Sequence, residues 1–259
     1  MKNSIVNSIA SLPPLSKTIS EIEKVCADES AGVIDLANVL QQDPMMVANL
    51  LKAANSPLYG FAKEIKNISQ AVSLFGMKIT QSIVTGNVIK KLLNVDMQPY
   101  GITSEKFATI SCFQAELLMQ WYKTIDKSIA EELYLVALLQ ESGKILIAND
   151  VLKNDEDISF RSEIEMSNNI SEVEKSYVSS TTAEVSAAIF EHWKFDEKFI
   201  ETMRASDDDS SLLNIVKTVV CVNKPFSEIS INIGLQKAEK AGYDLDKLQD
   251  AIDRLKEVF

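Results

Sequence analysis

The residues of this sequence that could carry out acid–base or metal chemistry are carboxylates and a single imidazole. Acidic residues are adjacent at 131–132, 155–157 and 207–209, and His192 is the only histidine in 259 residues. Paired carboxylates can act as general acid and base, and imidazole with carboxylate can hold a metal that activates water. A site that needs several imidazole ligands cannot be built within this monomer. The acidic runs stand in polar segments, and we predict that they are solvated.

Other catalytic patterns are missing from the sequence. There is no Gly-x-Ser-x-Gly turn, and the isolated glycines at 86, 143 and 234 do not form a phosphate-binding loop. Cys26, Cys112 and Cys221 are too far apart for a Cys-x-x-Cys motif, which argues against a disulfide framework and a structural zinc site. We therefore expect no metal and no cofactor.

Composition excludes further classes of function. The 37 acidic residues outnumber the 26 basic ones, and a net charge of −11 would repel a phosphate backbone, so we expect no nucleic-acid partner. The longest apolar run, 133–139, is far shorter than the roughly 20 residues of a membrane span. The first 14 residues do not resemble a signal peptide. We expect a cytoplasmic protein without a membrane span.

The elements that must position any site are helices, because apolar residues recur at helical spacing along most of the chain. Asp43 can cap a helix that has Pro44 at its first position. Thr103 or Ser104 could cap a long helix on which Ile110 points into the core. One further helix is predicted over 128–148, with Gln140 and Glu141 near its middle.

Two segments are predicted to be linkers. Residues 154–167 are polar and acidic, and 228–233 alternate with period two but have no partner strand elsewhere in the sequence. The predicted fold class is therefore all-α.

Several motifs, taken in order, resemble one family. They are Leu12-Pro13-Pro14-Leu15, Asp43-Pro44, the string from Lys52 to Gly60, the segment 69–76, Leu138 to Lys144, and 182–193. Together they are similar to the HDOD domain, a degenerate relative of the HD phosphohydrolases. Those enzymes carry Leu-Leu-His-Asp-Ile-Gly-Lys where this chain has Leu-Leu-Gln-Glu-Ser-Gly-Lys at 138–144.

The resemblance implies which positions have lost metal ligands. In catalytic HD enzymes the ligands would fall at Ile110, Gln140, Glu141, near Thr182 and at about Asp207. Only two of these residues are carboxylates. The resemblance thus implies a protein without catalytic residues and without a metal.

The resemblance also implies an architecture and a role. We expect an HDOD domain over 12–212, made of an N-terminal helical bundle (12–98) packed on a degenerate HD-like helical core (99–212), and a helical extension over 213–259. The implied role is bacterial signal transduction through protein contacts, with response regulators or cyclic-dinucleotide enzymes as partners, in the control of motility, biofilm or virulence.

Two alternative functions remain at this point. One is residual phosphodiesterase activity with a metal held by Glu141, Asp207 and other carboxylates, and the other is a nucleotide sensor that uses the vestigial cleft. The string that ends at Gly60 has a structural interpretation, which we favour, and an alternative one as a recognition surface. Together with the preceding Asp-Pro motif, the family residues to which we assign a structural role are Asp43, Pro44, Asn55, Ser56, Tyr59 and Gly60.

Overall fold

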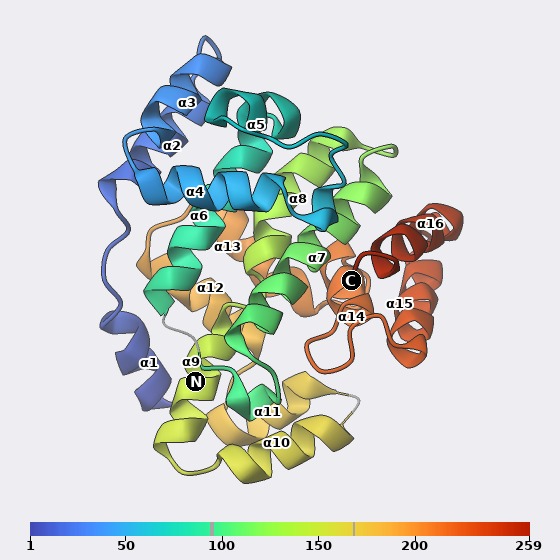
Figure 1. Cartoon of the computed structure of the whole chain (residues 1–259). Coiled ribbons are helices and arrows are strands. Elements are labelled where there is room, and N and C mark those ends of the chain that lie inside the picture. The colour runs from blue at the N-terminus through green and yellow to red at the C-terminus, as the bar shows by residue number, and fades with distance from the viewer. Residues whose placement is uncertain (94–95, 168) are drawn as a thin grey trace. The chain divides into compact units, whose positions relative to one another are not determined.

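The computed structural model describes residues 1–93, 96–167 and 169–259 (Figure 1). Every regular element in these residues is a helix, which confirms the all-α fold class. The chain forms two compact units. The smaller one comprises 14–89 with the last two residues, and the larger one comprises 1–13 and 90–257. The domain limits expected at 12, 98 and 212 stay predictions.

The smaller unit is a set of short helices that begin and end at recognisable signals. Asp43 caps α4, because its Oδ1 accepts from the backbone nitrogens of Met45 and Met46 at 2.8 and 3.3 Å, and Pro44 takes the first helical position. Within this unit α3 packs on α2 and α5. The elements are α2 (Lys17–Ala27), α3 (Val33–Leu40), α4 (Pro44–Ala54), η1 (Pro57–Tyr59), α5 (Ile68–Phe75) and most of α6 (Met77–Leu93).

The string from Asn55 to Gly60 closes α4 through specific contacts. The Asn55 amide donates to the carbonyls of Leu51 and Ile65, each at 2.9 Å, and its Oδ1 accepts from the Ile65 nitrogen at 2.8 Å. Gly60 has φ of 60°, a conformation that favours glycine. Ser56 lies at the N-cap of η1, and the Tyr59 ring packs edge-on against Phe75 at 4.8 Å between centroids. These contacts are all internal to the smaller unit.

Replacing Asn55 with alanine is expected to lower the free energy of unfolding by about 2 kcal/mol, because three hydrogen bonds are lost. Two of them satisfy the backbone nitrogen and carbonyl of the buried residue Ile65. Urea unfolding monitored by circular dichroism measures the change. Asn38→Ala is the matched control, since Asn38 lies exposed on α3. Equal stabilities of the two variants would contradict the assigned role.

The larger unit contains the remaining helices. Its centre is the antiparallel pair α7 and α8, with α14 and α16 beside α7, while α9 packs on α12 (Figure 1). Thr103 caps α7 as predicted, and Ile110 is fully buried. In the described residues no helix combines the length and the apolar character of a membrane span. The elements are α1 (Asn3–Ala10), η2 (Gln98–Tyr100), α7 (Ser104–Tyr122), α8 (Lys127–Leu139), α9 (Gly143–Lys153), α10 (Asp157–Met166), α11 (Ile170–Val178), α12 (Thr182–His192), α13 (Glu197–Arg204), η3 (Ala205–Asp207), α14 (Leu212–Val219), α15 (Glu228–Lys240) and α16 (Leu245–Lys256).

The prediction of a single helix over 128–148 is wrong. Helix α8 ends at Leu139 and α9 begins at Gly143, so the Gln140–Glu141 pair lies in the turn between them. The physical reason is a contact that is distant in sequence. The Gly143 nitrogen donates to Ser186 Oγ on α12 at 2.8 Å, and an added Cβ at Gly143 would lie 2.4 Å from the Thr182 carbonyl oxygen.

Both predicted linkers are also wrong. Most of 154–167 forms α10, which buries only Phe160 and Ile164, one helical turn apart, and so has a largely polar composition. The segment 228–233 begins α15, because the Ser227 hydroxyl caps the Ser230 nitrogen at 3.2 Å. The face that α15 buries consists of small residues, Ser230, Gly234 and Ala238, which a search for large apolar residues does not detect.

One buried carboxylate on α7 makes stability depend on pH. Burial raises the pKa of Glu116 from 4.5 to about 7, although the Gln120 amide and the Lys123 charge oppose the shift. Between these values the folded state binds more protons than the unfolded state, so stability falls as pH rises from about 4.5 to 7. At 1.36 kcal/mol per pH unit, the loss contributed by Glu116 is about 3 kcal/mol.

Glu116→Gln is therefore expected to gain stability relative to the parent protein as pH rises. Urea unfolding of both proteins at pH 5 and pH 8 measures the effect, and the gain is expected to be larger at pH 8 by about 2 kcal/mol. The exposed Glu105→Gln on the same helix provides the control. A pH-independent difference for Glu116→Gln would contradict the raised pKa.

Candidate functional site

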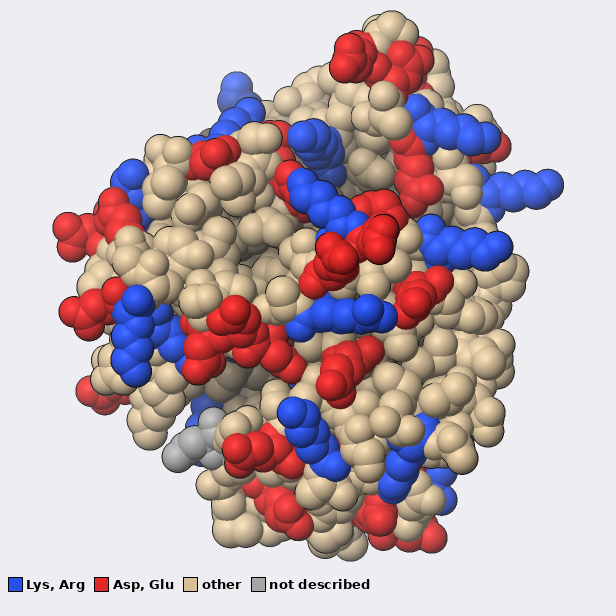
Figure 2. Space-filling view, turned by 180° about the vertical axis from the view of Figure 1, so that it is seen from behind, with Lys and Arg blue, Asp and Glu red and all other residues tan. Residues whose placement is uncertain are grey.

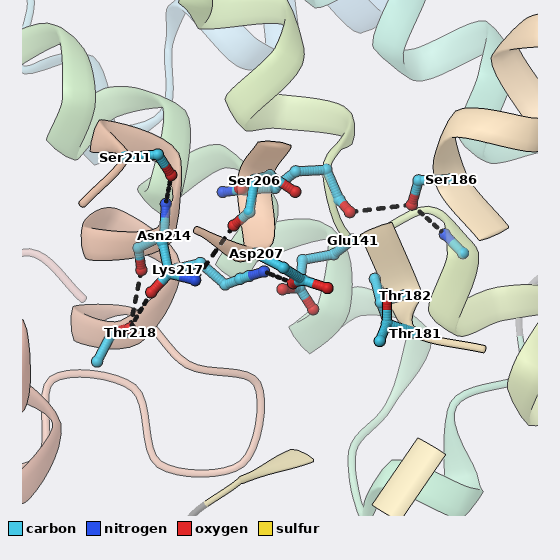
Figure 3. A network of polar contacts seen from close by, with 12 residues as sticks. Glu141, Thr181, Thr182, Ser186, Ser206, Asp207, Ser211, Asn214, Lys217 and Thr218 are labelled. Atoms are coloured by element: carbon cyan, nitrogen blue, oxygen red, sulfur yellow. Dashed lines mark hydrogen bonds and ion pairs between the residues drawn. The ribbon is translucent and has the colours of Figure 1, made fainter. Parts of the chain in front are cut away.

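A cleft of about 640 Å³ in the larger unit is the candidate site, and α9, α11, α12, α14 and α15 contribute to its lining. Glu141, Thr182 and Asp207 all line it, so three of the five vestigial ligand positions lie in one cleft (Figure 3). Ile110 and Gln140 do not line it. They are fully buried in the protein interior.

Gln140 takes part in a chain of neutral amides. Its Nε2 donates to Gln114 Oε1 on α7 at 3.0 Å, and Gln114 Nε2 donates to the Val220 carbonyl at the end of α14 at 2.9 Å. The backbone carbonyl of Gln140 accepts from Ser186 Oγ at 3.0 Å. The Gln140 side chain therefore links the end of α8 to α7 and, through Gln114, to the end of α14, while its backbone carbonyl contacts α12; these are structural roles.

Two residues that line the cleft, Lys144 and Thr182, belong to a buried network around Glu174, which does not itself line the cleft. Its Oε1 accepts from Lys144 Nζ at 2.7 Å, from Thr182 Oγ1 at 2.6 Å and from the Tyr100 hydroxyl at 2.9 Å. Its Oε2 accepts from the Thr182 nitrogen at 2.7 Å. Lys144 Nζ also lies 3.3 Å from Glu141 Oε2. One lysine is thus held between two buried carboxylates.

The charges of this network stabilise one another. Burial alone would lower the pKa of Lys144, but the carboxylates of Glu141 and Glu174 outweigh it and raise that pKa above its usual value. Burial and the Glu174 carboxylate raise the pKa of Tyr100 well above its usual value. Near neutral pH Lys144 is therefore charged and Tyr100 is a neutral hydrogen-bond donor.

Asp207 is neutralised by a lysine of α14. Lys217 Nζ lies 2.7 Å from Asp207 Oδ1, and both side chains are largely buried (Figure 3). Burial alone would raise the pKa of Asp207, but the Lys217 ammonium, a hydrogen bond from Thr181 and the charge of Lys144 together lower it. Asp207 is thus ionised and paired, which differs from the solvated state predicted for this acidic run.

Lys237, on α15, contacts polar side chains of α14. Lys237 Nζ on α15 lies 2.6 Å from Asn214 Oδ1 and 3.2 Å from Thr218 Oγ1. It also lies 2.8 Å from Asp209, whose side chain is 80% exposed. Asn214 and Thr218 stand with Lys217 on the same stretch of α14 (Figure 3). Neutral oxygens therefore fix the Lys237 ammonium, and its carboxylate partner is exposed to solvent.

The residues of this cleft do not fit the divalent metal of an HD phosphohydrolase. Glu141 and Asp207 each lie beside an ammonium group, and the other vestigial positions carry isoleucine, glutamine and threonine. Within the described ranges no three His, Cys, Asp or Glu side chains come together as a possible metal site. His192 is exposed at the end of α12, where a ring nitrogen lies 3.3 Å from the Leu12 carbonyl oxygen.

The lysines and their partners are residues that the sequence does not predict as a site. Glu174, Lys217 and Lys237 stand 30 to 93 residues from Lys144, and no short motif connects them. The one available signal was Lys144 itself, because a lysine beside the apolar stripe of a buried segment needs a carboxylate partner.

Comparison with known proteins identifies the family. The chain is 25% identical over 207 residues to an uncharacterized protein of Treponema pallidum (strain Nichols), and the match covers 78% of this chain and 38% of that protein. The fold is similar to that of a candidate phosphohydrolase of Shewanella amazonensis, with a TM-score of 0.73, 20% identity, and coverage of 100% of this chain and 99% of the other.

A candidate signal transduction protein of Marinobacter aquaeolei has the same fold, with a TM-score of 0.72 and 20% identity over 96% of this chain and 57% of that one. At these identities the two structures establish the fold alone. The sequence model of the HDOD domain family matches residues 12–208, which is most of the chain, and this range agrees with the motifs found in the sequence. The chain therefore belongs to the HDOD domain family.

Proposed function

We propose that this protein is a non-catalytic signalling module that acts through protein contacts. The observation that carries the proposal is the pairing of both remaining carboxylates, Glu141 with Lys144 at 3.3 Å and Asp207 with Lys217 at 2.7 Å. A metal would have to displace ammonium groups that the chain itself supplies. Without a metal these positions offer no group that would activate water.

Membership of the HDOD family and the shared fold with a candidate signal transduction protein support the signalling part of the proposal. The family resemblance suggests response regulators and cyclic-dinucleotide enzymes as the first partners to test, and motility, biofilm formation and virulence as the processes in which to test them.

Metal content is the first measurement. Protein purified without chelators and without a histidine tag is expected to contain manganese, iron and zinc far below one ion per chain, and to leave phosphodiester substrates intact when manganese is added. Near-stoichiometric metal together with hydrolysis that is lost in Glu141→Gln would overturn the proposal in favour of a residual phosphodiesterase. The exposed Glu172→Gln serves as the matched control for that variant.

A further inference from the structure

The cleft is positively charged although the protein is acidic. Among the described residues, five lysines and three carboxylates line it, in a chain whose net charge is −11. Lysines still outnumber carboxylates when the buried Glu174, which is paired with Lys144, is counted with the lining residues. Over the face that Figure 2 shows, basic and acidic side chains are interspersed. The excess of lysine in the cleft is thus a local feature, and it favours an anionic ligand.

Three of these lysines have charge available for a ligand. Lys175 on α11 and Lys224 after α14 are exposed and form no ion pair with any described carboxylate, although Lys224 Nζ lies 3.5 Å from the neutral carbonyl oxygen of Glu165. Lys237 is held by neutral oxygens, and its pairing with the exposed Asp209 is weak because solvent screens it. An anion can displace Asp209 without leaving a buried carboxylate unpaired.

The cleft also has an apolar wall next to these charges. Ile229, Ile233 and Lys237 are spaced four residues apart on α15, so they form one stripe, and all three line the cleft. Ile229 is 61% exposed, and Ile170 on α11 also lines the cleft. A ligand with a phosphate at Lys237 can therefore place a non-ionic part against isoleucine.

We propose that the cleft binds a small organic phosphate, with Lys175, Lys224 and Lys237 around the phosphate and Ile229 and Ile233 against the rest of the ligand. A volume of about 640 Å³ is suited to a molecule of nucleotide size. Lys224 and Lys237 lie beyond residue 208, where the match to the HDOD model ends. The proposed site is thus built jointly by the HDOD domain and the C-terminal helices, and it goes beyond the proposed function.

Isothermal titration calorimetry of the full chain in EDTA tests the proposal, with inorganic phosphate, GMP and cyclic di-GMP as probes. At least one nucleotide is expected to bind saturably and more tightly than inorganic phosphate. Lys237→Met and Lys175→Met are each expected to weaken that binding about tenfold, the effect of losing one charge-assisted contact. Asp209→Asn is expected to strengthen it severalfold, because Lys237 then has no competing carboxylate.

Lys240→Met is the matched control, since Lys240 lies on α15 but does not line the cleft. Absence of saturable binding by both nucleotides, or equal affinities of the control and the two cleft-lysine variants, would overturn the proposal. Equal affinities for phosphate and GMP would overturn the role of the isoleucines. Because EDTA removes metals, this result is independent of the metal test, and either proposal can fail alone.

Discussion

Replacing Glu174 with alanine is expected to lower the free energy of unfolding by about 3–5 kcal/mol, the cost of leaving a buried charge without its partner. Glu174 is fully buried and accepts hydrogen bonds from Lys144, Thr182 and Tyr100. Its removal leaves Lys144 with one carboxylate partner among the described residues, Glu141 at 3.3 Å, and it leaves the Thr182 nitrogen without an acceptor at the start of α12. Urea unfolding measures the loss.

Two further variants separate the charge effect from packing. Glu172→Ala, on an exposed position of the same helix, is expected to cost well under 1 kcal/mol. Lys144→Met is expected to lower the free energy of unfolding less in the Glu174→Ala background than in the parent protein. In the parent protein the substitution leaves the buried Glu174 carboxylate without its ammonium partner, whereas in the double variant that carboxylate is absent. Additive costs of the two substitutions would show that Lys144 and Glu174 are not coupled.

Gly143→Ala is expected to destabilise the protein by about 3 kcal/mol, the upper end of the usual cost of overpacking a core. A Cβ at this position would lie 2.4 Å from the Thr182 carbonyl oxygen and 2.8 Å from the Ser186 nitrogen, both of them backbone atoms of α12. The helices would have to separate. Lys144 would then move away from Thr182 Oγ1, which it contacts at 3.0 Å.

Gly32→Ala is the matched control for this variant. A Cβ at Gly32 would find its nearest neighbour at 4.0 Å, and we expect a cost below about 1 kcal/mol. Thermal unfolding followed by circular dichroism compares the two proteins. A Gly143→Ala protein as stable as Gly32→Ala would mean that α9 and α12 can move apart freely, and the close approach of the two helices would have no structural importance.

Local signals in the sequence predicted much of the fold. Asp43-Pro44 marks the start of α4 and Thr103 that of α7, since capping depends on residues adjacent in the chain. The break at 140–142 could not be predicted, because it depends on a hydrogen bond from Gly143 to Ser186, 43 residues away. The start of α15, at 228–233, was missed because the face that this helix buries consists of small residues, with an added Cβ at Gly234 only 2.4 Å from Val219 Cγ2.

The candidate site could be predicted only in part, for a similar reason. Family resemblance indicated Glu141, Thr182 and Asp207, and all three line the cleft. Their partners come from other helices, and helical periodicity does not show which lysine meets which carboxylate. Lys217 has the spacing of an ordinary polar residue on an amphipathic helix, so its pairing with Asp207 becomes visible only in three dimensions.

The ion pair between Lys217 and Asp207 has a consequence for how the protein depends on its surroundings. A metal ion is exchanged with the cell, so the state of a metalloprotein varies with metal supply and with competing chelators. An ammonium group that is part of the chain is present from the moment of synthesis, at a fixed ratio of one to one. For the signalling module that we propose, this pair needs no metal to stay closed, so this part of the cleft is expected to keep the same conformation in cells that are starved of metal and in cells that are rich in it.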